Sequence, residues 1–273
     1  MSRLRAVVIA TAAIGASVGI ALGGTRMLLT RQAALARRRI GKPLGELAPR
    51  ADRIWRRRLP GEAVDLLVLG DSIAAGLGAD RRKDTLGGRL AKGLARRTGR
   101  PVRLRTAAIV GSESSALAEQ LDGLPADYAA DIAVIVVGGN DVTHRIPVAV
   151  SADHLGSAIL RLRAQGTAVV VGTCPDLGAL RPVPQPLRAL GSQLSRQLAA
   201  AQAAVAVRTG ARAVSLRRAV GPVFISEPDV MFGLDRFHPS ALGYRRTAEA
   251  LLPVIVDALE GTPSGTPSPV VAA

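Results

Sequence analysis

Four short segments of the sequence carry side chains that hydrolytic chemistry uses. Ser72 lies in the stretch Gly-Asp-Ser directly after the apolar run VDLLVL, and Asn140 follows two glycines after another apolar run. Far downstream, His238 stands three residues after Asp235. A serine hydroxyl is a weak nucleophile at neutral pH, so it needs a base within hydrogen-bond reach and a third group that orients the base. The sequence offers Ser72, His238 and Asp235 for these three catalytic roles.

The same segments also contain hydrogen-bond donors for an oxyanion. The candidates are the main-chain N–H groups of Ser72 and Gly111 and the side-chain amide of Asn140. Fixed donors of this kind stabilise the charge that develops when a carbonyl is attacked. Taken alone, Ser72 could be a helix N-cap. A phosphate-binding loop is disfavoured because the stretch GDSIAAGLG contains neither Gly-Lys-Ser/Thr nor G-x-G-x-x-G.

Strands that alternate with helices along the chain must position these candidate catalytic residues. Apolar runs typical of buried strands alternate with stretches that carry Leu and Ala at helical spacing, which predicts a parallel sheet covered by helices on both faces. The expected strands are 64–70, 102–111, 131–139, 168–173 and 211–216, and the expected helices are 85–98, 113–122, 151–165, 187–209 and 240–259. In such sheets ligands bind outside the carboxyl ends of the strands, and the candidate residues fall at those ends.

In order along the chain, these blocks resemble the four sequence blocks of the SGNH (GDSL-type) hydrolases. The blocks are Gly70-Asp71-Ser72, Gly111, Gly138-Gly139-Asn140-Asp141 and Asp235-x-x-His238-Pro239. The resemblance covers about residues 64–259 and implies a three-layer α/β/α sandwich with a flavodoxin-like five-stranded parallel sheet. It also implies a serine esterase mechanism without a metal or an organic cofactor. The second block of the family often has an asparagine a few residues before its glycine, whereas this chain has Ala107 and Ala108 there.

We therefore expect an acyl hydrolase that cleaves a carboxylic ester of a lipid, an acetylated glycan or another small alcohol. Two alternatives stay open: an acyltransferase of the same fold, and a catalytically silent, membrane-tethered module that binds carbohydrate or lipid. In a chain with 2% aromatic residues, the grouping of Phe224, Met231 and Phe232 indicates an apolar acyl pocket, although loop packing explains it equally well. His144 has no acid at a comparable spacing, so we expect it to be structural.

The N-terminus differs in character from the rest of the chain. Residues 6–25 contain no charged side chain, which predicts a membrane anchor or a cleaved signal peptide within residues 1–30, and hence a membrane-associated or secreted protein. Residues 31–63 are expected to be a basic linker, residues 64–259 the hydrolase domain, and residues 260–273, rich in Pro, Gly, Ser and Thr, a disordered tail.

Charge and composition narrow the range of partners. The net charge is +15, and residues 1–58 contribute 13 Lys/Arg against 2 Asp/Glu, or +11 of it. A basic segment beside an apolar run favours anionic lipid over nucleic acid, and few aromatic rings are present on which bases could stack. The single cysteine, Cys174, excludes an internal disulfide and a multi-cysteine metal site, and we expect it to be a small buried residue.

Overall fold

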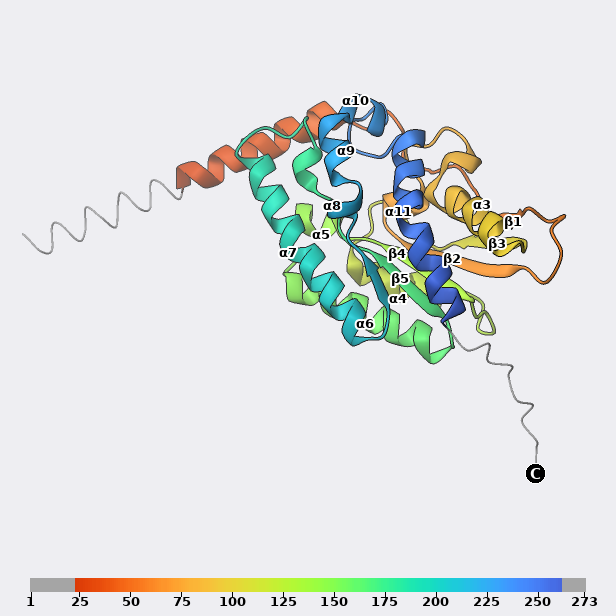
Figure 1. Ribbon diagram of the computed structural model, residues 1–273. Coiled ribbons are helices and arrows are strands. Elements are labelled where there is room, and N and C mark those ends of the chain that lie inside the picture. Colours follow the sequence, from red (N-terminus) through yellow and green to blue (C-terminus); the bar gives the residue numbers. More distant parts are fainter. Residues whose placement is uncertain (1–22, 262–273) are drawn as a thin grey trace, which may run out of the picture.

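The computed structural model describes residues 23–261, which are built around one six-stranded sheet (Figure 1). The strand order is β1-β3-β2-β4-β5-β6, with β1 antiparallel to β3 and all other neighbours parallel. Apolar side chains on both faces make the central strands continuously buried, as in sheets covered on both sides. The strands are β1 (Arg53–Trp55), β2 (Val64–Gly70), β3 (Val102–Thr106), β4 (Ile132–Val136), β5 (Ala168–Gly172) and β6 (Arg212–Val214).

Four long helices and the shorter α4 cover the two faces of the sheet. On one face, Leu66 and Val68 of β2 share a core cluster with α3 (Leu86–Thr98) and α11 (Ala241–Glu260). On the other face, the alternate β2 residues Leu67 and Leu69 share a cluster with α4 (Leu117–Asp122), α6 (Val148–Ala164) and α7 (Leu187–Arg208). Alternation along the strand thus divides one apolar run between two cores, which gives a three-layer α/β/α arrangement (Figure 1).

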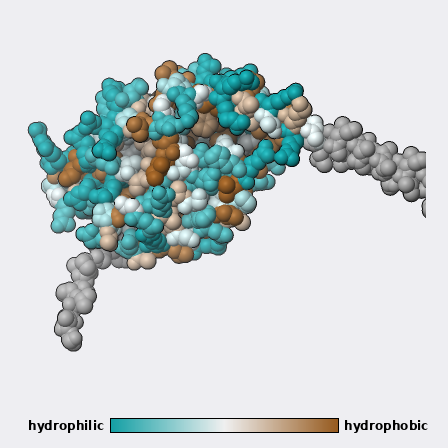
Figure 2. All heavy atoms as spheres, turned by 180° about the vertical axis from the view of Figure 1, so that it is seen from behind, coloured by the Kyte–Doolittle hydropathy of each residue, from teal (hydrophilic) through white to brown (hydrophobic). Residues whose placement is uncertain are grey.

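Short helices fill the connections at the ends of the strands. They are α2 (Ser72–Ala75), α5 (Gly139–His144), α8 (Leu216–Ala219), α9 (Gly221–Ser226) and α10 (Pro228–Met231), with single 3₁₀ turns at η1 (Arg82–Asp84), η2 (Ser114–Ala116) and η3 (Leu177–Ala179). Both α2 and α5 follow the carboxyl end of a parallel strand, which is the edge where a ligand site is expected. In the view from behind, polar side chains cover most of the surface and apolar ones lie in small separate groups (Figure 2).

All five predicted strands and five predicted helices are confirmed within a few residues. The five-stranded sheet is a correction, because β1 adds a sixth, antiparallel strand at the edge. Its sequence, Arg-Ile-Trp, is short and basic and therefore carries no clear strand pattern. Burial holds it in place: Trp55 is 9% exposed, and its indole N–H donates to the Ala51 carbonyl at 3.1 Å. The predicted strand 102–111 ends early, at Thr106.

The N-terminal part of the described chain is helical over residues 23–40, drawn at the red end of the colour scale (Figure 1). Among the helices described, none combines the length and the apolar character needed to cross a bilayer. Most of the uncharged run 6–25 and nearly all of the predicted tail 260–273 lie outside the described residues. Membrane attachment through residues 6–25 therefore stays a prediction.

Gly70 ends β2 in a backbone conformation that favours glycine, at a point where β4 leaves no room for a side chain. Its φ is +129°, and an added Cβ would lie 1.9 Å from the carbonyl oxygen of Val136 on β4. Gly99 offers a matched comparison, because its φ is +67° but an added Cβ would meet nothing within 4 Å. A comparison of substitutions at the two glycines therefore separates the cost of backbone strain from the cost of steric overlap.

We predict that Gly99→Ala lowers the free energy of unfolding by about 1–2 kcal/mol, the usual strain of a left-handed alanine. Gly70→Ala should lower it by more than about 4 kcal/mol or prevent folding, because the strands must separate to admit the methyl group. Urea denaturation of both purified variants checks this difference. Equal losses in the two variants would contradict the tight contact between Gly70 and β4.

Candidate active site

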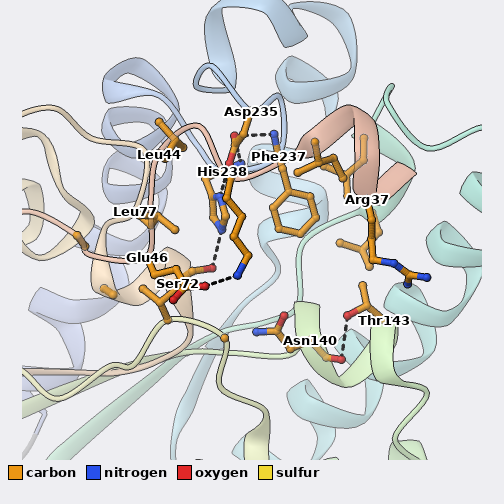
Figure 3. A pocket seen from close by; sticks show the side chains of 18 of the residues that line it. Arg37, Leu44, Glu46, Ser72, Leu77, Asn140, Thr143, Asp235, Phe237 and His238 are labelled. Carbon is orange, nitrogen blue, oxygen red and sulfur yellow. Dashed lines mark hydrogen bonds and ion pairs between the residues drawn. The ribbon is translucent and has the colours of Figure 1, made fainter. Parts of the chain in front are cut away.

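Ser72, His238 and Asp235 form a continuous hydrogen-bonded chain at the carboxyl edge of the sheet (Figure 3). The Nε2 atom of His238 lies 2.9 Å from Oγ of Ser72, and its Nδ1 atom lies 2.5 Å from Oδ2 of Asp235. Ser72 is the first residue of α2, immediately after β2, so the rigid sheet fixes its position. The structure thus brings together the three residues that the sequence separates by as many as 166 positions.

A tight turn holds Asp235 and His238 in register. Oδ1 of Asp235 accepts hydrogen bonds from the N–H groups of Phe237 and His238, both at 3.0 Å, and Arg236 between them adopts a φ of +54°. Burial alone would raise the pKa of Asp235, but hydrogen bonds from the side chain and backbone of His238 and from the backbone of Phe237 lower it below 3.8. Asp235 is therefore a carboxylate at neutral pH.

The loop after α2 packs directly against the histidine segment, and a glycine makes this possible. An added Cβ at Gly78 would lie 2.5 Å from the Pro239 carbonyl oxygen and 3.1 Å from Cβ of His238. On the same loop, the Leu77 carbonyl accepts a hydrogen bond of 2.6 Å from the buried Tyr244 hydroxyl of α11. These contacts fix the distance between the serine and histidine segments.

The three predicted oxyanion donors lie around one cavity. Ser72, Gly111 and Asn140 all line the cavity that His238 lines. Nδ2 of Asn140 donates one hydrogen bond to the Ser112 carbonyl at 2.8 Å, which orients the amide and leaves its second N–H for another acceptor. An added Cβ at Gly111 would meet nothing within 4 Å, so no close packing demands glycine there. Its φ of +86° is the feature that favours glycine.

Two buried side chains hold the loops of the site, and of these the sequence indicated Asp141, in the third block, but not Gln120. Gln120 of α4 bonds to both backbone groups of Gly70, with its Oε1 accepting from N–H at 2.9 Å and its Nε2 donating to the carbonyl at 2.8 Å. Asp141 accepts from the N–H of Ser114 at 3.0 Å, which ties the loop after β3 to α5. No sequence motif marks Gln120, because its partner lies 50 residues away.

His144 pairs with an acid that lies far from it in the sequence. Its Nδ1 atom lies 2.6 Å from Oε1 of Glu113, a contact that agrees with the structural role expected for it. The pair joins α5 to the loop after β3 across 31 residues, a separation that spacing rules do not detect. His144 also lines the cavity that Ser72 and His238 line.

Two cavities meet at Ser72. The larger, of about 1500 Å³, lies over the triad, and one of its walls is formed by residues between Ala33 and Asp52, in the segment predicted to be a linker (Figure 3). The smaller, of about 70 Å³, lies next to Ser72 and Asn140 and is walled by apolar side chains that include Phe224 and Phe232. These two rings pack edge to face with centroids 5.0 Å apart. Met231, the third predicted pocket residue, is 1% exposed and packs in the core instead.

The single cysteine takes no part in the hydrogen-bonded chain of Ser72, His238 and Asp235. Cys174 is buried, its N–H donates to Gln202, and burial raises the pKa of its thiol well above the usual value. As predicted, it is a small buried residue. Within residues 23–261, no three His, Cys, Asp or Glu side chains come together in a way that could hold a metal ion.

Asp71 is a buried carboxyl group directly beside Ser72. It is 3% exposed, and its Oδ1 caps α2 by accepting from the N–H of Ile73 at 2.9 Å. Burial raises its pKa to about 6, although the hydrogen bond from Ile73 and the charge of His238 act in the opposite direction. The folded protein therefore disfavours the ionised form of Asp71.

Residues 68–246 match the model of the GDSL-like Lipase/Acylhydrolase family. A GDSL-like esterase of Mycobacterium tuberculosis is 40% identical to the chain over 270 residues, covering 95% of this chain and 85% of that protein.

Solved structures show the same fold. A lipase/acylhydrolase from Enterococcus faecalis has 20% identity and a TM-score of 0.57, over 70% of this chain and 94% of its own. The acetylxylan esterase Axe2 from Geobacillus stearothermophilus has 19% identity and a TM-score of 0.57, over 72% of this chain and 95% of its own. TesA has 27% identity and a TM-score of 0.55, over 71% of this chain and 99% of its own.

The raised pKa of Asp71 makes stability depend on pH with a defined sign. The penalty for ionising this carboxyl in the folded state is absent below pH 3.8, grows up to pH 6 and is fully present above it. In the Asp71→Asn variant the side chain at this position cannot ionise. The free energy of unfolding of this variant relative to the parent should therefore rise by about 2–3 kcal/mol between pH 4 and pH 7.

Urea denaturation of both proteins over this pH range measures the difference. Any fixed cost of the amide, such as a lost hydrogen bond, shifts the difference equally at every pH and does not affect the comparison. A difference that stays constant from pH 4 to pH 7 would show that Asp71 titrates at its ordinary pKa.

Proposed function

The chain belongs to the GDSL-like lipase/acylhydrolase family and is a carboxylic ester hydrolase, and we propose that it works through an acyl-enzyme on Ser72. The observation that carries this proposal is the hydrogen-bonded chain from Asp235 through His238 to Ser72, with distances of 2.5 and 2.9 Å. A nucleophile, a base and an orienting acid in this order are the parts that serine-dependent acyl transfer needs.

In the first half of the proposed reaction, Oγ of Ser72 attacks the ester carbonyl carbon while Nε2 of His238 takes its proton. The carbonyl oxygen becomes an oxyanion that accepts hydrogen bonds from the N–H groups of Ser72 and Gly111 and from Nδ2 of Asn140. When the tetrahedral intermediate collapses, the bond to the alcohol oxygen breaks and His238 gives its proton to that oxygen. The alcohol leaves, and the acyl group stays on Ser72.

In the second half, His238 takes a proton from water, and the hydroxide attacks the acyl carbon. The bond to Oγ of Ser72 then breaks, His238 returns the proton to Oγ, and the carboxylic acid leaves. Asp235 remains ionised throughout, since its hydrogen bonds lower its pKa, and its charge stabilises the imidazolium of His238 in both halves.

The two cavities support an assignment of the two sides of the ester. The apolar cavity of about 70 Å³ beside Ser72 has room for an acyl group of about two to four carbons. The cavity of about 1500 Å³ has room for a much larger alcohol. We therefore propose a short-chain ester of a bulky alcohol as substrate. An acetylated glycan is one such ester, and an acetylxylan esterase is among the proteins with this fold.

Replacement of the nucleophile tests the mechanism. Ser72→Ala should lower kcat for p-nitrophenyl acetate by about 10⁴-fold or more. Asn140→Ala should lower it by about 10²- to 10³-fold, because one oxyanion donor is lost. Thermal unfolding of each variant establishes that it is folded, and unchanged turnover in a folded variant would remove that residue from the mechanism.

A fluorophosphonate probe separates the alternatives, because it should label the parent protein and not Ser72→Ala. A folded parent that neither reacts with the probe nor hydrolyses any ester would be a silent binding module. Ester formation with an added alcohol, at the expense of hydrolysis, would instead indicate an acyltransferase, for which the larger cavity leaves room.

The acyl-chain preference tests the role of the smaller cavity. Phe232→Ala removes one of its aromatic walls, so the ratio of kcat/KM for p-nitrophenyl hexanoate to that for the acetate should rise by at least about tenfold. Leu234→Ala is the control, because this side chain is 83% exposed and lines neither cavity. An equal ratio in the parent and both variants would place the acyl group elsewhere.

A further inference from the structure

The segment of residues 33–52, which we call the strap, forms part of the wall of the larger cavity. We propose that the strap and two facing arginines form a subsite for an anionic group, a phosphate or a carboxylate, on the alcohol part of the ester. This inference rests on the proposed function, because the alcohol occupies the larger cavity only if the acyl group occupies the smaller one.

Both ends of the strap are anchored to the hydrolase domain. Just before the strap, Gln32 lies at the start of α7, where its Oε1 accepts from the N–H of Leu187 at 3.1 Å and its Nε2 donates to the Gln185 carbonyl at 2.5 Å. At its other end Ala51 is 5% exposed and accepts the indole N–H of Trp55, which belongs to the edge strand β1. The part in between is therefore held over the carboxyl edge of the sheet.

The strap residues lie around the same cavity as the triad. Arg37, Leu44 and Glu46 surround it together with Ser72 and His238 (Figure 3). A ligand that reaches Ser72 through this cavity must therefore pass side chains of the strap. The segment thus belongs to the substrate site and is more than a connection to the N-terminus.

Cationic side chains dominate the polar lining of this cavity. Apart from the triad and His144, which is paired with Glu113, the charged lining residues are five cations and two acids. They are Arg37, Lys42, Arg50, Arg145 and Arg188, against Glu46 and Asp52. One acid is already neutralised, since Glu46 forms an ion pair with Lys42. The remaining lining carries four arginines against one aspartate.

None of these four arginines forms an ion pair with any residue in the part of the chain that the structure describes. Arg145 is the C-cap of α5, which also carries Asn140. Five residues of helix correspond to about 7 Å along the axis. Arg145 therefore lies at a distance from the oxyanion site that suits a group on the alcohol part of the ester and not the reacting carbonyl.

The chemistry of arginine indicates the class of ligand. A guanidinium stays charged at all working pH values and binds phosphate and carboxylate through paired, planar hydrogen bonds. Positive charges that line a concave wall also attract anions more strongly than the same charges would on an open surface. The smaller, apolar cavity also borders Ser72, and its lining suits an uncharged acyl group.

Matched acetyl esters test the subsite. We would compare 4-acetoxybenzoate and 4-acetoxyphenylphosphonate, which are anionic, with neutral 4-acetoxybenzamide, each corrected for its rate of alkaline hydrolysis. The parent protein should favour the anionic esters in kcat/KM by about tenfold or more, and 0.5 M NaCl should reduce this preference because salt screens exposed charges. The carboxylate and phosphonate arms show which anion is preferred.

The double variant Arg37→Gln/Arg145→Gln should lower the ratio of anionic to neutral kcat/KM by about tenfold. The control is Arg208→Gln at the exposed end of α7, which makes the same change of charge per residue outside the cavity. It should leave the ratio unchanged. A ratio that does not respond to the double variant, or that falls equally in the control, would overturn the proposal.

Binding to Ser72→Ala separates this inference from the proposed function. In that variant 4-acetoxybenzoate should bind more tightly than 4-acetoxybenzamide in a calorimetric titration, whether or not the parent turns either ester over. Equal binding would overturn the anionic subsite and leave the serine mechanism intact. Absence of serine-dependent turnover together with tighter binding of the anion would overturn the mechanism and leave the subsite intact.

Discussion

The hydrogen bond between His238 and Ser72 is the contact that the rest of the structure must maintain, because it joins two segments 166 residues apart at 2.9 Å. The serine side is fixed by β2 and by the two hydrogen bonds from Gln120 to Gly70. The histidine side is fixed by the turn around Asp235 and by the close packing of Gly78 against Pro239. Each support has little freedom, which is how a site on loops can have the precision of a site on strands.

The pKa values of two buried carboxyl groups beside this contact shift in opposite directions, and hydrogen bonding explains the difference. Asp235 accepts from two backbone N–H groups and from the imidazole of His238, and its pKa falls despite burial. Asp71 is 3% exposed and accepts from fewer donors, and burial raises its pKa to about 6. Asp235, which bonds to the imidazole of His238, thus has enough donors to stay ionised, while Asp71 contributes mainly the cap of α2.

The parts of the fold that the sequence could predict are those with a local signal. Five strands and five helices carry periodic apolar residues. Ser72 and Asn140 follow strand ends, and His238 lies three residues after its acid partner Asp235. Features that depend on long-range contacts were missed: the edge strand β1, the role of Gln120 and the pairing of His144 with Glu113. The strap shows this best, because residues 33–52 look like a basic linker and only the folded chain places them over Ser72.

The most direct test of the account is to locate the covalent intermediate. An aryl carbamate such as p-nitrophenyl dimethylcarbamate would transfer its carbamoyl group to the nucleophile, and the product hydrolyses slowly enough to be mapped by peptide mass spectrometry. The account predicts release of one nitrophenol per chain and a carbamoyl group on Ser72. A carbamoyl group on another residue, or ester hydrolysis by a protein that never forms the adduct, would contradict it.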